Sequence, residues 1–520
     1  MKALSIFLSF CVGFLSLSQE ILWVRLVSFS QHGRPQAFSI VLTAFLIGIA
    51  LGAIAGKRIC QREPDLPRAA TRLLLQAAAL DLLCLYIASA ALTYAPFQLM
   101  GLFGLIAMSA MFKGMLFPLV HHMGSQAATE RVGRSVSHVY MANVLGAALG
   151  PLMTGFVLLD RVSVERSFAL IACAGAVLAL ITLLATRSRA KKWWIPAVLF
   201  CGLTAYVASA PPPVIHDLLA ADGSTIKHII QNKHGIIHVK SSDGEPGGDV
   251  TYGNNMYDGK ISTDLHINSN RLDRAYLMAV MHPKPKRVLV IGLSSGAWTR
   301  VIAGLPDVAH IDVIEINPAY LELIGRYEAF SGLLKDPRIN IHIDDGRRWL
   351  RAHPQARYDL VFMNSTFHWR AYMTLLLSGE FMQQVSGHLN TGGIFAMNTT
   401  GSADVFFTAQ QNFKHVVRYS NFAYMSQMPL QKRADAEQVL RQARLGSLPA
   451  FSAELFNEKS LGHRLTHDRL ESAAEFLANE ARNPAPAAIH DQNLLTEFRH
   501  GRQPLFGLLE NWLPATPHKD

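Results

Sequence analysis

The sequence predicts a multi-pass α-helical membrane domain followed by an α/β domain with a parallel sheet. Half of the 520 residues are hydrophobic and only 17% are charged, a composition typical of a chain partly embedded in lipid. Long apolar stretches are confined to residues 1–210. After the Pro211-Pro212-Pro213 break, short apolar runs alternate with amphipathic segments of helix length. These two patterns divide the chain into a membrane region and an α/β region.

Basic residues are in excess only in the first region. Residues 1–210 hold 17 Lys and Arg against 7 Asp and Glu, whereas residues 211–520 hold 31 of each. A basic excess confined to loops between apolar runs indicates membrane topology, and the neutral second region offers no field for binding phosphates. We therefore expect membrane lipid as a partner and no nucleic-acid partner.

Seven stretches are long and apolar enough to cross a bilayer as helices, which takes about 20 residues each. They cover roughly residues 4–23, 37–55, 73–92, 99–120, 139–159, 168–185 and 193–208. The first stretch lacks the small-residue cleavage site of a signal peptide, so we expect it to remain as a helix.

Lys and Arg gather in three of the loops between these spans. They are Lys57, Arg58, Arg62, Arg68 and Arg72 in one loop, Arg131 and Arg134 in the next, and Arg187, Arg189, Lys191 and Lys192 in the third. Because such loops stay cytoplasmic, we expect a multi-pass protein of the inner cell membrane with a cytoplasmic N-terminus. Seven crossings then make the domain after Ala210 extracytoplasmic, and one misjudged span would reverse its side.

Ionisable residues near or within the spans are Glu20, Arg25, Asp81 and Lys113. Glu20 and Arg25 indicate either a polar pocket or transport path, or an interfacial carboxylate beside an arginine that reaches the interface. We favour the second interpretation because both residues lie toward the end of the first span. The five cysteines all precede residue 202, and no Cys or His has partners at metal-ligand spacing, so the sequence predicts no metal site.

The second region is expected to contain a small β-rich lead-in at residues 211–285, an α/β domain at 286–430 and a helical extension at 431–520. Strand-length apolar runs in the α/β domain cover residues 288–291, 311–314, 339–343, 360–363 and 393–397. Helix-length stretches separate these runs, which predicts a doubly wound parallel sheet covered on both faces.

Candidate ligand-binding residues follow the first three of these strands. Gly292 and Gly296 lie in the turn after the first strand, where glycine lets the backbone approach a ligand. Glu315 ends the second strand and can accept hydrogen bonds from ribose hydroxyls. Asp345 and Gly346 follow the third strand, within reach of an adenine amino group. The set predicts a nucleoside site of the adenosylmethionine type, and ordinary strand-end turns and caps are the alternative.

Residues 252–398 resemble the spermidine synthases, or polyamine aminopropyltransferases, whose fold is that of the class I methyltransferases. The similar segments are YDGKIS, VLVIGLSSGAWTR, VIEINP, IDDGRRWL and YDLVFMNST. In the family these positions hold a substrate-binding Asp-Gly segment, the glycine turn, the ribose-binding strand end, the adenine contact and the catalytic strand. SQEILWVRL, FLIGIALGAIAG and RVGRSVSHVYMANVLGAALGPLMTGFVLL resemble the N-terminal part of fused transporter-like/spermidine-synthase proteins.

The resemblance implies transfer of an aminopropyl group from decarboxylated S-adenosylmethionine, or a related adenosine thioether, to a small polyamine-type acceptor without a metal. It leaves a homo-oligomer open. The cofactor contacts that it implies are Gly292, Ser295, Gly296, Glu315, Asp345 and Gly346, and the substrate contacts are Asp258 and Tyr276.

Acidic positions of the family are replaced in this chain. Asn364 stands at the catalytic Asp, Phe367 at the second Asp of its Asp-x-x-Asp motif and Ser295 at the Asp of the glycine turn. Met278 replaces the Glu after Tyr276, and Ser262 replaces a Gln. An amine must lose a proton before it attacks the methylene beside a sulfonium, and an asparagine amide cannot take that proton.

His368 follows the catalytic strand and is a candidate substitute base, because its unperturbed pKa lies near neutrality. The alternative, which we favour, is a histidine on a surface loop.

Three functions are left open. The resemblance implies a membrane-bound, spermidine synthase-like alkyltransferase with degenerate catalytic acids. A second function is another transferase on the same nucleoside-binding scaffold, with a non-cationic acceptor delivered from or near the membrane. The third is a catalytically silent nucleoside-binding or transport-linked membrane protein. We place the first ahead because the resemblance covers most of the chain.

Overall fold

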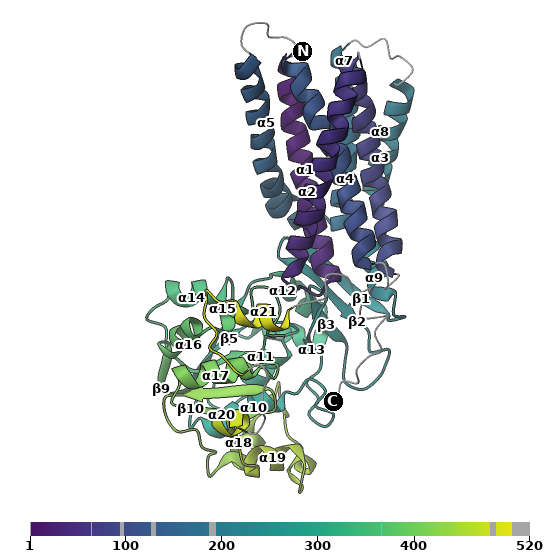
Figure 1. The fold of residues 1–520 in the computed structure, drawn as a ribbon. Coiled ribbons are helices and arrows are strands. Elements are labelled where there is room, and N and C mark those ends of the chain that lie inside the picture. The colour runs from purple at the N-terminus through teal and green to yellow at the C-terminus, as the bar shows by residue number, and fades with distance from the viewer. Residues whose placement is uncertain are drawn as a thin grey trace, which may run out of the picture.

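The computed structural model describes residues 2–63, 65–93, 98–125, 132–186, 194–365, 367–478 and 485–501. The helices of the first region stand side by side as a bundle, and the α/β domain lies at one end of that bundle (Figure 1). The N-terminal end of the first helix lies at the opposite end. Of the basic loop residues, Arg131, Arg187, Arg189, Lys191 and Lys192 fall outside the described residues.

A helix occupies each of the seven predicted stretches. The helices are α1 (Lys2–Ser30), α2 (Gln36–Arg62), α3 (Leu66–Thr93), α4 (Gln98–Ser125), α5 (Val132–Met153), α7 (Val164–Thr186) and α8 (Trp194–Ser209). Helix α5 contains Pro151 and continues through the π-helical turn η2 (Thr154–Leu158) into α6 (Leu159–Arg161). Six described helices are long and apolar enough to cross a membrane, and α8 makes a seventh if it is counted with α9 (Val214–Ala220), which is bent from it by 49°.

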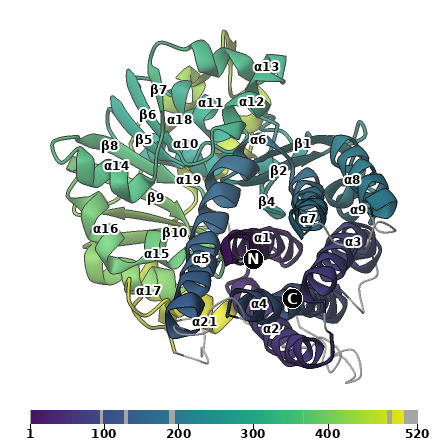
Figure 2. The ribbon, with the colours of Figure 1, turned by 90° about the horizontal axis from the view of Figure 1, so that it is seen from above.

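Small residues bring the helices of the bundle close together. A Cβ at Gly48 or Gly52 of α2 would lie 2.2 Å from the carbonyl oxygen of Ala107 or Met111 in α4, so only glycine permits this approach. Helix α1 lies among the other helices (Figure 2). The outer faces are apolar: Ile195 and Leu199 of α8 are 72% and 68% exposed, as expected for a surface that contacts lipid.

Asp81 of α3 and Lys113 of α4 form an ion pair inside the bundle. Lys113 Nζ donates to both carboxylate oxygens of Asp81 at 2.8 Å. Gln19 Nε2 and Ser109 Oγ donate to Asp81 Oδ1 at 2.7 and 3.0 Å. Both charges are therefore buried and hydrogen-bonded, which is the arrangement that a low-dielectric interior requires.

Arg25 leaves the bundle and binds the α/β domain. Its guanidinium donates to the carbonyl oxygens of Asn232 and Lys233 at 2.9 and 2.6 Å. Arg25 thus reaches the end of the bundle, whereas Glu20 is buried within α1. The two side chains face different surroundings and form no ion pair within the described part of the chain.

The lead-in begins with an antiparallel sheet in the order β1-β2-β3-β4. Its strands are β1 (Ile226–Asn232), β2 (Gly235–Lys240), β3 (Val250–Gly253) and β4 (Met256–Lys260), and α10 (Asp273–Met281) follows. The Arg25 contacts lie on the turn between β1 and β2, so this small sheet connects the bundle to the main domain.

The main sheet has eight strands in the order β14-β10-β11-β9-β8-β5-β6-β7. The five predicted strands are β5 (Arg287–Ile291), β6 (His310–Glu315), β7 (Ile339–Ile343), β8 (Tyr358–Met363) and β9 (Leu389–Asn398), and they pair in parallel. The antiparallel strands are β10 (His415–Tyr419), β11 (Phe422–Ser426) and β14 (Glu471–Ser472). The sheet is therefore mixed and not wholly parallel as predicted, because β10 and β11 are joined by a short turn that permits only antiparallel pairing.

Helices cover both faces of this sheet (Figure 1). They are α11 (Ala297–Ala303), α12 (Ala319–Gly325), α13 (Glu328–Ser331), α14 (Gly346–Ala352), α15 (Thr374–Leu377), α16 (Gly379–Ser386), α17 (Ala403–Asn412), α18 (Ala436–Gln442), α19 (Leu461–His467), α20 (Ala473–Ala478) and α21 (Leu495–His500). A two-residue pair, β12 (Arg444–Leu445) and β13 (Leu448–Pro449), lies apart from the main sheet. Along β5, Val288 and Val290 belong to one hydrophobic cluster and Leu289 and Ile291 to another, so the strand is buried on both sides.

Candidate functional site

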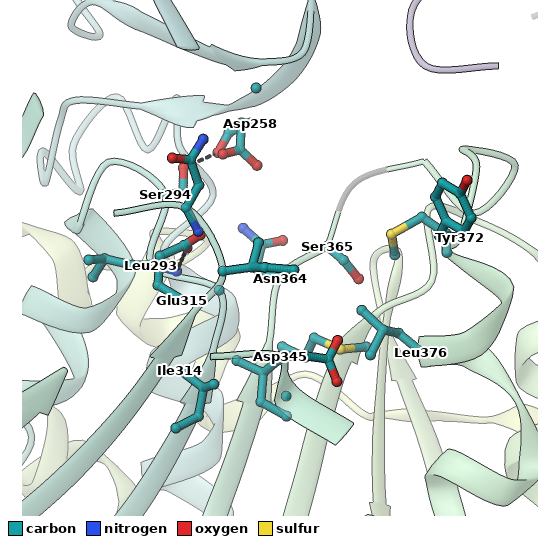
Figure 3. Close-up of a pocket in the computed structure, with 18 of the residues that line it drawn as sticks. Asp258, Leu293, Ser294, Ile314, Glu315, Asp345, Asn364, Ser365, Tyr372 and Leu376 are labelled. Carbon is teal, nitrogen blue, oxygen red and sulfur yellow. Dashed lines mark hydrogen bonds between the residues drawn. The ribbon is translucent and has the colours of Figure 1, made fainter. Parts of the chain in front are cut away.

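A cavity of about 670 Å³ lies at the carboxyl ends of β5, β6, β7 and β8. Figure 3 shows Asp258 and Glu315 on one side of it and Ser365, Tyr372 and Leu376 on the other. We call the part lined by the turns after β5, β6 and β7 the β5–β7 lobe. The part lined by the segment after β8 we call the β8 lobe; it is formed by Met363, Asn364, Ser365, Arg370, Tyr372, Met373 and Leu376.

Glu315 ends β6 and is held in place by backbone donors. Its Oε2 accepts from Leu293 N at 2.7 Å and its Oε1 accepts from Asn317 N at 2.8 Å. The residue is 4% exposed, and this burial raises the pKa of Glu315 to about 7. The backbone of Ser294 contributes a third hydrogen bond to this carboxylate. Because an ionised carboxylate offers about four acceptor positions, one position is left for a donor from a ligand in the cavity.

The turn after β5 brings backbone to the cavity wall. Gly292 has φ +90°, and a Cβ built on it would meet nothing within 4 Å. This open space lies beside the β5–β7 lobe, so a ligand can approach the main chain there. Ser294 has φ +48° and donates from Oγ to the carbonyl of Asp258 at 2.5 Å, which ties the turn to β4.

Asp345 and Gly346 lie at the start of α14. Asp345 caps this helix: its Oδ1 accepts from Arg348 N at 2.9 Å. A Cβ on Gly346 would lie 3.0 Å from Ile291 Cγ2, so a small residue is needed for α14 to start against the end of β5. Asp345 lines the cavity with its second oxygen free for a donor such as an adenine amino group.

Asp258 of β4 reaches the same cavity from the small sheet. Tyr320 Oη donates to its Oδ2 at 2.5 Å. Burial raises the pKa of Asp258, opposed by the Tyr320 hydrogen bond and by the Arg370 charge. The pKa of Tyr320 lies well above its usual value, first because it is buried and then because of the Asp258 charge.

Asn364 follows β8 and is oriented by neighbouring amides. Asn398 Nδ2 donates to Asn364 Oδ1 at 3.0 Å. Asn398 Oδ1 in turn accepts from Thr400 N and from Asn421 Nδ2, both at 2.8 Å. Asn364, at the position where the sequence predicted an altered catalytic residue, is therefore the end of a hydrogen-bonded chain of amides that continues through Asn398 to Asn421.

The loop after β8 is held by the helical bundle. Ala371 N donates to the carbonyl of Gly33, between α1 and α2, at 3.0 Å. The Arg34 guanidinium lies 5.0 Å from the centroid of the Trp369 ring, a cation–π distance. Tyr372 has φ +68°, which is strained for a residue with a side chain and persists only where surrounding contacts hold it. One wall of the cavity thus depends on the bundle.

Four residues named from the sequence lie outside the cavity lining. Tyr276 is fully buried in the core, with its ring 4.8 Å from that of Phe451. Ser295 Oγ donates to the carbonyl of Lys260 at 3.0 Å, and Gly296 precedes α11 with φ +78°. His368 is the fourth, and its side chain lies against Thr400 and His500.

The environment of His368 does not suit a base for a reaction in the cavity. Its Nδ1 lies 2.7 Å from Thr400 Oγ1 and its ring stacks edge-on against His500 at 4.8 Å. Burial and the nearby His500 lower the pKa of His368 to about 4. The side chain is half-buried against α21, so the surface-loop interpretation is also inaccurate.

Sequence reasoning missed several cavity residues. Tyr320 and Tyr372 carry no motif, and the bidentate ion pair of Arg347 with Asp491, at 2.6 and 2.7 Å, joins segments 144 positions apart. Arg370 follows His368 in the loop that the sequence predicted to cover the site, but no role was predicted for it. The tail segment HDQNLLTEFRHGR, which contains Asp491, loosely resembles the C-terminal Thr-Asp-Asp stretch of the family and is the available signal for that residue. Among the described residues, no group of three His, Cys, Asp or Glu side chains is placed to hold a metal ion.

Comparison with known proteins supports the two-part organisation. Residues 275–431 match the family described as Spermine/spermidine synthase domain, and residues 8–220 match the Major Facilitator Superfamily. Polyamine aminopropyltransferase 2 of Ralstonia nicotianae is 24% identical over 433 residues, which is 77% of this chain and 79% of that protein. The Polyamine aminopropyltransferase of Corynebacterium efficiens is 24% identical over 408 residues, which is 75% of this chain and 76% of its own length.

Other relatives align with a smaller share of this chain. The Polyamine aminopropyltransferase of Vibrio vulnificus is 24% identical over 194 residues, which is 35% of this chain and 64% of that protein. A crystal structure of spermidine synthase in complex with the transition state analogue AdoDATO is 20% identical, with a TM-score of 0.34, over 39% of this chain and 74% of its own. The two family matches and the relatives from Ralstonia nicotianae and Corynebacterium efficiens confirm the resemblance seen in the sequence for both regions.

Proposed function

We propose that this chain is a membrane protein whose α/β domain binds decarboxylated S-adenosylmethionine, or a related adenosine thioether, and acts as an alkyltransferase of the aminopropyltransferase type. The observation that carries the proposal is Glu315. Its buried carboxylate binds three backbone donors, keeps one acceptor position and lines a cavity at the carboxyl ends of parallel strands. A ribose hydroxyl is a donor that fits this position.

The other residues of the β5–β7 lobe complement this assignment. The free oxygen of Asp345, one strand farther along the sheet, would accept from an adenine amino group. Gly292 leaves open space for the ligand to pass close to the main chain. A nucleoside bound in this way would direct its sulfonium substituent toward the β8 lobe, because β8 is the neighbour of β5 on the other side.

The same geometry argues against rapid transfer to a polyamine. An ammonium acceptor needs a group that removes its proton, and Asn364 stands where the family has that carboxylate. Loss of a positioned general base typically lowers the rate by about 10²–10⁴. We therefore propose degenerate catalysis toward cationic amines and retain nucleoside binding as the part of the function best supported.

Titration calorimetry with 5′-methylthioadenosine tests nucleoside binding. Glu315→Ala should lose a charge-assisted hydrogen bond to the ribose of about 1.5–3 kcal/mol. The matched control is Glu322→Ala, because Glu322 is exposed on the adjacent α12 and pairs with Arg326. Equal affinities in wild type and Glu315→Ala, with a normal melting curve for the variant, would remove the ribose role.

We also propose that the bundle crosses the inner membrane with its N-terminus in the cytoplasm and the α/β domain outside. Support comes from the basic loops and from the placement of the α/β domain and the start of α1 at opposite ends of the bundle (Figure 1). Alkaline phosphatase and a fluorescent protein, each fused after Asp520, distinguish the two sides. A silent phosphatase with bright fluorescence would place the domain in the cytoplasm.

A second candidate function is a catalytically silent, transport-linked nucleoside-binding protein. The buried Asp81–Lys113 pair favours it, because ionisable residues inside membrane helices commonly mark transport paths. Nucleoside binding without transfer to any acceptor would favour this candidate over the transferase.

A further inference from the structure

The β8 lobe presents hydrogen-bond donors where a polyamine site would present acceptors. The first donor is Asn364, whose orientation follows from a backbone group. Thr400 N can only donate, so the atom of Asn398 that it contacts at 2.8 Å must be the amide oxygen. The other end of Asn398 is then its NH₂ group, which donates to Asn364 Oδ1. The Asn364 oxygen is therefore engaged, and its NH₂ group remains for a ligand.

Ser365 and Arg370 add two further donors. The Ser365 hydroxyl is a buried atom without a hydrogen-bond partner among the described residues, and its residue lines the cavity. Arg370 is half-buried, lines the same cavity and forms no ion pair in the described part of the chain. Its charge acts on Asp258, whose Oδ2 already accepts from Tyr320. A buried hydroxyl without a partner is costly unless a ligand satisfies it, and the half-buried guanidinium beside it can bind an anion at the cavity wall.

The rest of the lobe is apolar. Met363, Met373 and Leu376 line it, and the ring of Tyr372 is 81% exposed. This side of the cavity is also the side contacted by the loop between α1 and α2, through Gly33. An apolar wall next to the end of a membrane-type bundle suits a molecule with an apolar body better than a free polyamine.

We infer that the acceptor is an amphipathic anion, with a carboxylate or phosphate head group bound by Asn364, Ser365 and Arg370 and an apolar body along Met373 and Leu376. This inference rests on the proposed nucleoside site. An oxygen of the anion forms a bond to the methylene carbon beside the sulfonium while the carbon–sulfur bond breaks and its electron pair returns to sulfur. The products are an ester and a neutral thioether, and the positive charge of the sulfonium cancels the negative charge of the anion.

This acceptor accounts for the absence of an acid at position 364. An anionic oxygen carries no proton on its attacking lone pair, so no general base is needed. The donors of the lobe bind one oxygen and leave another to react.

Three probes with the same alkyl chain and different head groups distinguish the effect of head-group charge from that of the apolar body. The full chain in phosphatidylcholine nanodiscs, saturated with 5′-methylthioadenosine, is titrated with decanoate, decyl phosphate and decylamine, which share one chain length. We expect one or both anions to bind at least tenfold more tightly than decylamine, and the stronger anion identifies the head group. Decylamine binding as tightly as both anions would overturn the inference.

Two variants and a control locate the site. Arg370→Gln should weaken binding of the preferred anion about tenfold to a hundredfold, the range for one charge-assisted hydrogen bond. Asn364→Asp should reverse the preference toward decylamine, and it keeps the acceptor for Asn398. Arg357→Gln is the matched control, because Arg357 binds only nearby carbonyls. Unchanged anion affinity in Arg370→Gln, or an unchanged preference in Asn364→Asp, would overturn the assignment.

Failure of this inference can be told from failure of the proposed function. The affinity for 5′-methylthioadenosine is measured in the same samples and should stay within about twofold in the control Arg357→Gln. Nucleoside binding without anion selectivity rejects the acceptor class alone. Anion selectivity without nucleoside binding rejects the transferase and, with it, the role of the anion as acceptor.

Discussion

Nucleoside binding should become tighter as the pH rises from 6 to 8. Burial raises the pKa of Glu315 to about 7 in the free protein, and the ionised carboxylate is the form that accepts a charge-assisted hydrogen bond from a ribose hydroxyl. About one tenth of the molecules then carry ionised Glu315 at pH 6 and about nine tenths at pH 8. The Kd for 5′-methylthioadenosine should therefore be about tenfold higher at pH 6 than at pH 8.

The same ionisation also affects the stability of the free protein. An acid with a folded-state pKa of about 7, compared with 4.5 for the ordinary group, holds its proton longer in the folded than in the unfolded chain. The free energy of unfolding should therefore fall as the pH rises from about 4.5 to about 7, by about 3 kcal/mol in total. Ribose hydroxyls that hydrogen-bond to the carboxylate offset this cost in the complex.

Titration calorimetry at pH 6, 7 and 8 on the full chain in nanodiscs measures the effect. The thioether has no group that titrates in this range. Burial lowers the pKa of His234 and raises that of Asp258, which also line the cavity, so a Glu315 variant is needed to assign the effect. Glu315→Gln is the control and should bind weakly with no pH dependence. A wild-type Kd that stays constant or increases from pH 6 to pH 8 would refute the role of Glu315.

Three further predictions concern other parts of the molecule. Wild-type protein should transfer aminopropyl groups to putrescine very slowly or not at all. The double variant Asn364→Asp, Phe367→Asp should raise this rate by up to roughly 10²–10⁴ in a radiolabel assay. Rapid turnover by the wild type would contradict the account. Arg25→Ala should lose two hydrogen bonds of about 1.5–3 kcal/mol each and expose the domain junction to protease, and an unchanged cleavage pattern would argue against a docking role. Asp81→Asn should destabilise the bundle by about 3–5 kcal/mol. Adding Lys113→Met to this variant should recover part of the lost stability in a thermal-stability assay. Additive losses from the two substitutions would mean that the two side chains are not coupled.

The sequence was most informative where local pattern determines structure. The apolar stretches correspond to the bundle helices, and the five predicted strands all form. Glu315 and Asp345 reach the cavity because a residue at the carboxyl end of a parallel strand lies at one edge of the sheet regardless of the details of packing. The antiparallel strands β10, β11 and β14 and the pair β12 and β13 were missed, because each has five residues or fewer and is too short to be distinguished by pattern from a turn or a helical segment.

Residues whose positions depend on distant contacts were not predictable. Tyr276 matches a family position, yet its helix turns that side chain into the core against Phe451. Asn398 lies on the neighbouring strand β9, so its contact with Asn364 needs the strand order. The role of Arg370 depends on the loop between α1 and α2, more than 330 positions away.

The contact between Gly33 and the loop after β8 links ligand occupancy to the membrane region thermodynamically. If a bound ligand prefers the loop as it is held by Gly33, then by reciprocity the docked arrangement of α1 and α2 must be favoured by the same free energy when the ligand is present. A factor of ten in affinity corresponds to about 1.4 kcal/mol of such coupling. An isolated fragment from residue 211 onward would lack this contribution, and ligand affinities measured on it would describe an uncoupled domain.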